Sequence, residues 1–240
     1  MINKPALMIT CEHASNTVPD FVLRAFREYN LLEATRLGVE NSTNFGIPEE
    51  ILASHRGYDI GAYKVFSNLV KRLRPDFNCA SLFSRLVIDM NRSEVSTRLF
   101  SEFTTKLPKN VKAHIFRLWQ KYHEKIDKFV SGKIPKKLRD NQKQKHIKVI
   151  HLGIHSFTPV WKGVEREADV GILYDPDRPA EASLAERLIK SIHEFHPRLR
   201  IRKNYPYLGK SDGLTTILRQ KFGTAYVGLE IEINQKLLDF

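Results

Sequence analysis

Strand-like and helix-like segments alternate along most of this 240-residue sequence. Short apolar runs predict strands, and apolar residues at helical spacing predict helices between them. The expected strands are 5–11, 85–89, 147–154, 169–174, 199–203 and 225–233, and the expected helices are 20–30, 60–73, 111–131, 180–195 and 214–221. This order predicts a three-layer α/β/α fold around a central mixed, largely parallel sheet. The length suits one domain spanning residues 1–240.

The composition is ordinary for a globular protein, with 42% hydrophobic and 28% charged residues. No apolar run approaches the roughly 20 residues that a membrane-spanning helix needs, so no membrane insertion is expected. The first residues lead into a strand-like segment without the features of a secretory signal, which favours a cytoplasmic location. The two cysteines, Cys11 and Cys79, are expected to be free thiols in or near strands.

The formal net charge of +12 draws attention to a basic stretch between residues 133 and 148. Its basic residues are Lys133, Lys136, Lys137, Arg139, Lys143, Lys145 and Lys148. A solvated loop is the simpler interpretation, because charge runs are usually exposed. Aromatic residues are not interleaved through the stretch, which argues against a stacking surface for single-stranded nucleic acid. A polyanion contact remains the alternative, and a basic surface would also favour small carboxylates.

Two of the expected strands run out at a histidine, His13 and His155. Because sites in open α/β sheets form beyond the carboxyl ends of the strands, the fold could bring these imidazoles together. A hydrolytic zinc site uses two or three histidine or carboxylate ligands and keeps one position open for water. The pair therefore predicts a metal site, although each histidine taken alone is better explained as structural.

The third ligand could be Glu12, His55 or Asp59. Neighbouring strand residues point to opposite faces, so Glu12 should face away from His13 if the strand continues there. Asp59 is the preferred ligand. The alternative for Asp59 is capping of the helix expected to begin at Ile60, since aspartate is a favoured N-cap.

The segment from Arg85 to Arg92 is rich in groups that bind anions. Asn91 and Arg92 place a side-chain amide beside a planar guanidinium, which suits a substrate carboxylate. Arg85 could stabilise a tetrahedral oxyanion, and Asp89 could brace Arg92 or the loop backbone. Surface salt bridges are the alternative role for these arginines.

Glu230 and Glu232 alternate with apolar residues, which puts both carboxylates on one face of a strand. A buried carboxylate beside a metal-activated water can act as the general base. The alternative is an edge strand with a solvated face. Lys210 and His123 are further polar candidates.

Six ordered motifs together resemble the N-formylglutamate amidohydrolase family over nearly the whole chain. They are Cys11-Glu-His-Ala-Ser-Asn16, Gly57-Tyr-Asp-Ile-Gly-Ala62, Ser84-Arg-Leu-Val-Ile-Asp-Met-Asn-Arg92, Gly153-Ile-His-Ser-Phe-Thr-Pro159, Asp169-Val-Gly-Ile-Leu-Tyr174 and Leu229-Glu-Ile-Glu-Ile-Asn-Gln235. The resemblance implies a phosphorylase/hydrolase-like fold related to the zinc carboxypeptidases and aspartoacylases. It also implies hydrolysis of a small N-acyl amino acid, such as N-formyl-L-glutamate to formate and glutamate, by a metal-activated water.

The resemblance assigns roles to individual residues. It implies a divalent metal, with zinc preferred, held by His13, Asp59 and His155; catalytic Glu232 and Arg85; and substrate binding by Asn91, Arg92, Asn16 and Lys210. Glu232 fits the motif of the general base better than Glu230. Related peptidases take a carboxylate ligand close after the first histidine, where this chain has Asn16. The alternatives are the same chemistry on another N-acyl or peptide-like substrate, or a non-catalytic polyanion-binding homologue.

Overall fold

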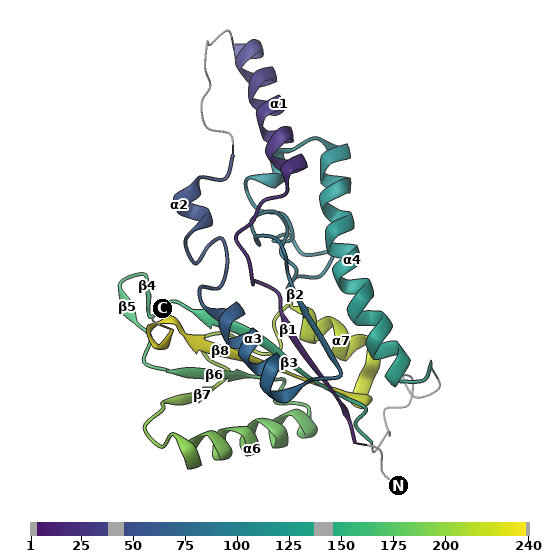
Figure 1. The fold of residues 1–240 in the computed structure, drawn as a ribbon, viewed down its shortest axis with the longest axis vertical. Helices are drawn as coiled ribbons and strands as arrows, with labels where there is room; N and C mark the ends of the chain where they lie inside the picture. Colours follow the sequence, from purple (N-terminus) through teal and green to yellow (C-terminus); the bar gives the residue numbers. More distant parts are fainter. Residues whose placement is uncertain (1–3, 38–45, 137–145, 239–240) are drawn as a thin grey trace.

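A six-stranded sheet forms the centre of the computed structural model, which describes residues 4–37, 46–136 and 146–238 (Figure 1). The strand order is β2-β1-β3-β8-β6-β7. The strands are β1 (Ala6–Cys11), β2 (Phe77–Ala80), β3 (Val149–Phe157), β6 (Val170–Leu173), β7 (Ile201–Lys203) and β8 (Tyr226–Asn234). Neighbouring strands are parallel except β6 and β8, which pair antiparallel. The predicted mixed, largely parallel sheet is confirmed.

Helices cover both faces of this sheet, as predicted (Figure 1). Helices α4 (Lys109–Lys133) and α7 (Leu214–Phe222) lie on one face, where α1 (Asp20–Leu37) packs against α4 and extends beyond the sheet (Figure 1). Helices α3 (Ala62–Leu73) and α6 (Pro179–Phe195) lie on the other face. The remaining elements are the short helix α2 (Glu49–Leu52), the 3-10 turns η1 (Thr104–Lys106), η2 (Gly223–Ala225) and η3 (Gln235–Leu237), and the hairpin strands β4 (Val160–Trp161) and β5 (Val164–Glu165). None of the described helices is both long and apolar enough to cross a membrane.

Alternation along the strands separates apolar from polar side chains at the carboxyl end of the sheet. Met8, Val149 and Tyr226 pack into the core beneath α4 and α7, whereas Ile9, Ile154 and Leu229 pack against α3 or α6. Because side chains alternate between faces, the polar residues Glu12, His155, Glu230 and Glu232 fall on the α4 side. Their strands are neighbours in register, with His155 opposite Glu232. The alternation of side chains that forms the core thus also places these acidic and histidine side chains on one face of the sheet.

The strand predicted at 85–89 is wrong. This segment is a loop of turns, and β2 at Phe77–Ala80 is the strand that pairs with β1. Val87 and Ile88 are fully buried in the α4-side core, so burial rather than pairing explains the apolar run. Ser84 and Arg85 bond instead to the carbonyl of Gly57. A short apolar run does not distinguish a strand from a buried loop.

The β4–β5 hairpin was not predicted. Its strands have two residues each, too few to show a period, and Lys162 and Gly163 make the turn with φ of 51° and 78°. The basic stretch 133–148 is described only at its ends, 133–136 and 146–148, so Lys137, Arg139, Lys143 and Lys145 lie outside the described residues. Lys133 and Lys136 are exposed.

A buried histidine, His151, links β1, β3 and β8 in the middle of the sheet. His151 is fully buried, with Nε2 2.7 Å from Thr10 Oγ1 and Nδ1 2.5 Å from the hydroxyl of Tyr226. Burial lowers the pKa of His151 to about 4, because the charged imidazolium would lose its hydration. The folded protein therefore keeps this ring neutral at pH values where an exposed histidine takes up a proton.

His151→Gln should weaken the acid sensitivity of folding. With a folded pKa below the unfolded value, only the unfolded chain gains this proton as pH falls from about 6.5 towards 4, so stability drops in that window. We expect the free energy of unfolding to fall between pH 7 and pH 5 by about 2 kcal/mol more in the wild type than in the variant. Urea titrations at the two pH values measure this difference. If the free energy of unfolding changed equally with pH in the wild type and the variant, His151 would not be the source of this acid sensitivity.

Candidate active site

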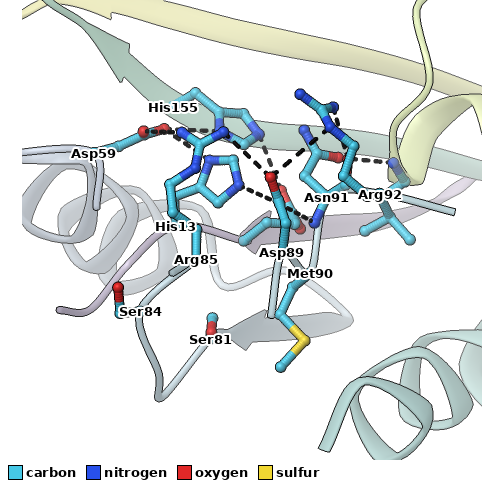
Figure 2. Close-up of polar contacts among 12 residues, drawn as sticks. His13, Asp59, Ser81, Ser84, Arg85, Asp89, Met90, Asn91, Arg92 and His155 are labelled. Atoms are coloured by element: carbon cyan, nitrogen blue, oxygen red, sulfur yellow. Dashed lines mark hydrogen bonds and ion pairs between the residues drawn. The ribbon is translucent and has the colours of Figure 1, made fainter. Parts of the chain in front are cut away.

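Three buried side chains converge at the carboxyl end of β1 and β3. Asp59, from the loop before α3, places Oδ2 2.9 Å from His155 Nδ1 and 3.4 Å from His13 Nδ1. The two imidazole centroids are 5.1 Å apart, and ligand atoms of the three residues all lie within 4.8 Å of one another. Figure 2 shows the three side chains pointing toward one another. The predicted cluster of His13, Asp59 and His155 therefore forms in space.

The local fold explains why each member reaches this point. His13 follows β1 by two residues, whereas His155 lies inside β3, which continues to Phe157. The N-cap alternative for Asp59 is wrong, because α3 begins only at Ala62 and Gly61 stands at the cap position. The backbone N–H of Asp59 instead donates to the His13 carbonyl at 2.9 Å. This bond holds the Asp59 loop against the end of β1.

Each histidine also contacts a second buried carboxylate, through Nε2, the ring nitrogen that does not contact Asp59. Asp89 Oδ1 lies 2.7 Å from His13 Nε2, and Glu12 Oε2 lies 3.0 Å from His155 Nε2. Glu12 also accepts a hydrogen bond from the Tyr122 hydroxyl at 3.0 Å. A carboxylate on the outer nitrogen fixes the ring and leaves the inner nitrogen free to bind a metal. The expectation that Glu12 faces away from His13 assumed that the strand continues to Glu12, but β1 ends at Cys11, and the contact of Glu12 with His155 was not anticipated.

The electrostatics of the cluster are those of a site that favours positive charge. Burial alone would raise the pKa values of Asp59 and Asp89. His13 and His155 instead hold the pKa of Asp59 well below its usual range, and His13, Arg85 and Arg92 do the same for Asp89. Burial alone would likewise lower the pKa of His155, yet its bonds to Asp59 and Glu12 raise that pKa well above the ordinary value. Three carboxylates thus surround two imidazoles, and this anionic surplus suits a bound cation.

The donor set fits zinc. Two imidazole nitrogens and one carboxylate oxygen match the ligands of catalytic zinc sites, which keep a further position open. A buried polar atom also has no partner here: Glu232 Oε2 makes no hydrogen bond within the described residues. Because Glu232 sits in register beside His155, this oxygen is available to a group bound at the cluster. The residues present therefore agree with a metal and a water at this end of the sheet.

The two glutamates of β8 differ in their surroundings. Glu230 Oε1 accepts a hydrogen bond from Thr215 Oγ1 at 2.9 Å. Glu232 is 5% exposed, and burial, with Asp59 and Glu230 adding to it, raises its pKa to about 8. The solvated edge strand considered as an alternative is wrong, since β8 lies between β3 and β6. Glu232 is thus the less satisfied carboxylate of the pair.

The loop after Arg85 faces the cluster with its polar side chains (Figure 2). Arg85 lies between two carboxylates, with Nη1 3.3 Å from Asp59 Oδ1 and Nη2 3.3 Å from Asp89 Oδ2. Asp89 accepts the backbone N–H of Asn91 at 2.9 Å and lies 3.8 Å from Arg92 Nε, so it braces both the loop and Arg92. The predicted bracing role of Asp89 is confirmed in geometry. Its bond to His13 was missed.

Asn91 and Arg92 each have side-chain donors that make no hydrogen bond within the described residues. Asn91 Oδ1 accepts the N–H of Leu214 at 2.7 Å, which leaves its amide N–H groups available. Arg92 Nη1 donates to the carbonyls of Asn91 and Asp212, while its Nη2 makes no hydrogen bond within the described ranges. From α4, Trp119 Nε1 donates to the Arg92 carbonyl at 2.9 Å, and His123 Nε2 lies 3.0 Å from the Met90 carbonyl. These bonds fix the loop on both sides of Asn91.

Two predicted substrate-binding residues lie apart from this cluster. Lys210 is exposed and pairs with Asp177 at 3.0 Å, and Asn16 is exposed in the loop after β1. Neither lines the cleft into which the cluster opens. His55 does line it, where its ring meets Trp161 at 5.8 Å, but it stands outside the three-ligand cluster. The motifs that contain Asn16 and Lys210 did not show that both side chains are exposed outside the cleft.

The cluster opens into a cleft of about 1180 Å³. His13, Asp59, His155 and Glu232 lie on one part of its wall, and Arg85, Asn91 and Arg92 on another. The β4–β5 hairpin and the 205–208 loop add a third part that contains Trp161, Arg166 and Tyr207. This third part was missed in the sequence, because its residues come from a hairpin and a loop that carry no periodic signal.

Known proteins resemble the chain in both sequence and fold. The family model for N-formylglutamate amidohydrolase matches residues 6–238. The crystal structure of gene product Atu2144 from Agrobacterium tumefaciens is similar at 25% sequence identity with a TM-score of 0.69, covering 98% of this chain and 82% of that one. A comparison with curated proteins finds no match.

A second solved structure shares the fold. N-formylglutamate amidohydrolase from Ralstonia eutropha JMP134 is 15% identical, with a TM-score of 0.52, and the similarity covers 98% of this chain and 83% of that chain. At this identity the likeness speaks for the architecture alone. The family match, in contrast, spans nearly the whole sequence. The chain therefore belongs to the N-formylglutamate amidohydrolase family, a family of hydrolases that act on amide C–N bonds.

Proposed function

We propose that this protein is a metal-dependent amidohydrolase that cleaves a small N-acyl amino acid, such as N-formyl-L-glutamate, into formate and glutamate. The observation that carries the proposal is the convergence of His13, Asp59 and His155 beside Glu232, whose Oε2 makes no hydrogen bond to any described residue. Family membership supports the reaction class. The cleft of about 1180 Å³ leaves ample room for a small N-acyl amino acid beside this cluster.

His13, Asp59 and His155 would hold the metal, and zinc is the metal that the donor set favours. When bound, zinc would act as a Lewis acid on the substrate carbonyl and would lower the pKa of water. Asp89 and Glu12 keep the two imidazoles in the orientation that binding requires. Three proposed ligands and two supporting carboxylates thus form one metal-binding position at the end of the sheet.

Glu232 is the proposed general base. Its carboxylate takes a proton from the attacking water and returns it to the nitrogen of the leaving amine, so that the C–N bond breaks without releasing an unstable amide anion. Burial excludes bulk water from this exchange, and the register opposite His155 keeps Glu232 beside the metal ligands. Glu230, already bonded to Thr215, is less suited to the role.

Arg85 and the Asn91–Arg92 pair are proposed to bind the substrate's anionic groups. Arg85, held between Asp59 and Asp89, offers charge to the oxyanion that develops on the carbonyl. The free donors of Asn91 and Arg92 suit the α-carboxylate of the amino-acid product. Because Asp89 contacts both the arginines and His13, it links substrate binding to the metal ligands.

A substrate panel tests the proposed function. The purified protein, loaded with zinc, should hydrolyse N-formyl-L-glutamate, and a chelator should abolish the reaction until metal is restored. Parallel assays with N-acetyl-L-glutamate and with dipeptides compare the acyl group. Chelator-resistant hydrolysis would contradict metal dependence, and activity confined to dipeptides would reassign the protein to peptide-like substrates.

A further inference from the structure

Arg166 is a buried arginine in the third part of the cleft wall. It follows β5, is 8% exposed and lines the same cleft as the His13–Asp59–His155 cluster. Its guanidinium carbon lies 5.5, 5.3 and 5.5 Å from the ring centroids of Phe157, Trp161 and Tyr207. Three aromatic faces therefore surround the guanidinium and keep it in place by cation–π contact.

The charge of Arg166 has no counterion in the described part of the chain. Within the described residues, its guanidinium donates from Nη1 to the carbonyl and hydroxyl of Thr158, at 3.4 and 3.3 Å, and it also hydrogen-bonds the Tyr207 side chain, so all of these partners are neutral. The equally buried Arg219 shows the usual arrangement, with Nε 2.9 Å from Glu181 Oε1. A buried unpaired charge is costly, so an arginine kept this way on a cleft wall is suited to an anion supplied by a ligand.

The backbone around Arg166 is fixed in advance. Its N–H donates to the Pro159 carbonyl at 2.7 Å, and its own carbonyl accepts from Asn234 Nδ2 at 3.3 Å. Phe157, which the guanidinium faces, lies two residues beyond His155 on β3 and on the same face of the strand. Residues two apart in a strand are separated by roughly 7 Å, so Phe157 and His155 bring Arg166 and the three-residue cluster to neighbouring parts of one cleft wall.

We propose that Arg166 binds the side-chain carboxylate of the substrate and sets the specificity for N-acyl dicarboxylic amino acids. This inference rests on the proposed function, in which Asn91 and Arg92 hold the α-carboxylate. The substrate then bridges two cationic walls of one cleft, with its scissile amide over the cluster. The aromatic faces of Trp161 and Tyr207 contact the methylene groups that join the two carboxylates.

The test compares N-formyl-L-glutamate with N-formyl-L-glutamine, which has nearly the same shape but lacks the negative charge. The wild type should prefer the glutamate substrate in kcat/KM, and Arg166→Met should lower that ratio by roughly thirtyfold or more, the loss typical of a truncated buried charge pair. Arg166→Lys keeps a positive charge among the three aromatic rings, so its glutamate/glutamine ratio should lie between those of the wild type and Arg166→Met. Arg98→Met, at an exposed arginine of the same cleft, is the matched control and should keep the wild-type ratio.

Several outcomes overturn the assignment. A wild type that does not distinguish glutamate from glutamine rejects it without any variant, as does a folded Arg166→Met protein that keeps the wild-type ratio. An equal fall in Arg98→Met would show that general charge, not this residue, sets the preference. If the wild type hydrolyses neither substrate, the proposed function fails, and calorimetric binding decides the subsite separately: tighter binding of N-formyl-L-glutamate than of N-formyl-L-glutamine, lost in Arg166→Met, supports it.

Discussion

Glu232→Gln is expected to lower kcat for N-formyl-L-glutamate by roughly a hundredfold or more, the scale of a lost general base. Glutamine has nearly the same shape but cannot take a proton from water. Glu232 makes no hydrogen bond through Oε2 within the described residues, so the amide replaces no internal bond at that atom. Steady-state kinetics, with metal content and the circular dichroism spectrum as checks on integrity, measure the effect.

Glu230→Gln is the matched control, because Glu230 lies on the same face of β8 two residues earlier. Its Oε1 already accepts a hydrogen bond from Thr215, and glutamine can keep that acceptor. We expect kcat to change by less than about tenfold. A larger loss in the Glu230 variant than in the Glu232 variant would transfer the base role to Glu230.

Much of the fold follows from the sequence because the strands of this sheet carry strong periodic signals. In β3 and β8 the positions that face α3 and α6 are apolar at nearly every second residue, and the helices α4 and α6 show clear amphipathic spacing. The error at 85–89 has a physical cause: Val87 and Ile88 are buried by contact with α4-side residues, not by strand pairing. An apolar run predicts that a segment is buried, but it does not predict whether the backbone of that segment pairs in a sheet.

The convergence of His13 and His155 could also be expected, because β1 and β3 end at the same edge and each delivers a histidine there. Asp59 reaches that edge from a loop. Its position depends on a backbone bond to His13, which no local pattern of residues encodes. The sequence therefore indicated the ligand types and left the choice between a cap and a ligand to the three-dimensional structure.

The supporting residues are harder to find from sequence. Glu12 and Tyr122 are 110 positions apart, and Asp89 and His13 are 76 apart, yet each pair is within hydrogen-bond distance. Arg166 was missed for a related reason, since a basic residue near an exposed hairpin looks like a surface group. Only the packing of three rings around it shows that it is buried. Long-range contacts of this kind depend on how loops and helices distant in sequence pack together.

The anionic surplus around His13 and His155 leads to the prediction about metal binding. Asp59, Asp89 and Glu12 are all buried, and Arg85 is the arginine that contacts two of them, Asp59 and Asp89. Without a cation, the two histidines must carry positive charge to balance the carboxylates, which agrees with the raised pKa of each ring. A bound divalent metal would take over that balance and leave both imidazoles neutral.

His13→Ala combined with His155→Ala is therefore expected to reduce bound zinc to below roughly one-tenth of an equivalent per chain, since one carboxylate cannot hold the ion alone. Asp89→Asn keeps all three ligands but weakens the support of His13, so zinc affinity should fall by about 10- to 100-fold. Metal analysis after equilibrium dialysis measures both. His193→Ala, an exposed histidine on α6, is the control and should keep full occupancy. Full zinc occupancy in the double variant would falsify the site, and unchanged affinity in Asp89→Asn would show that its bond to His13 has no part in holding the metal.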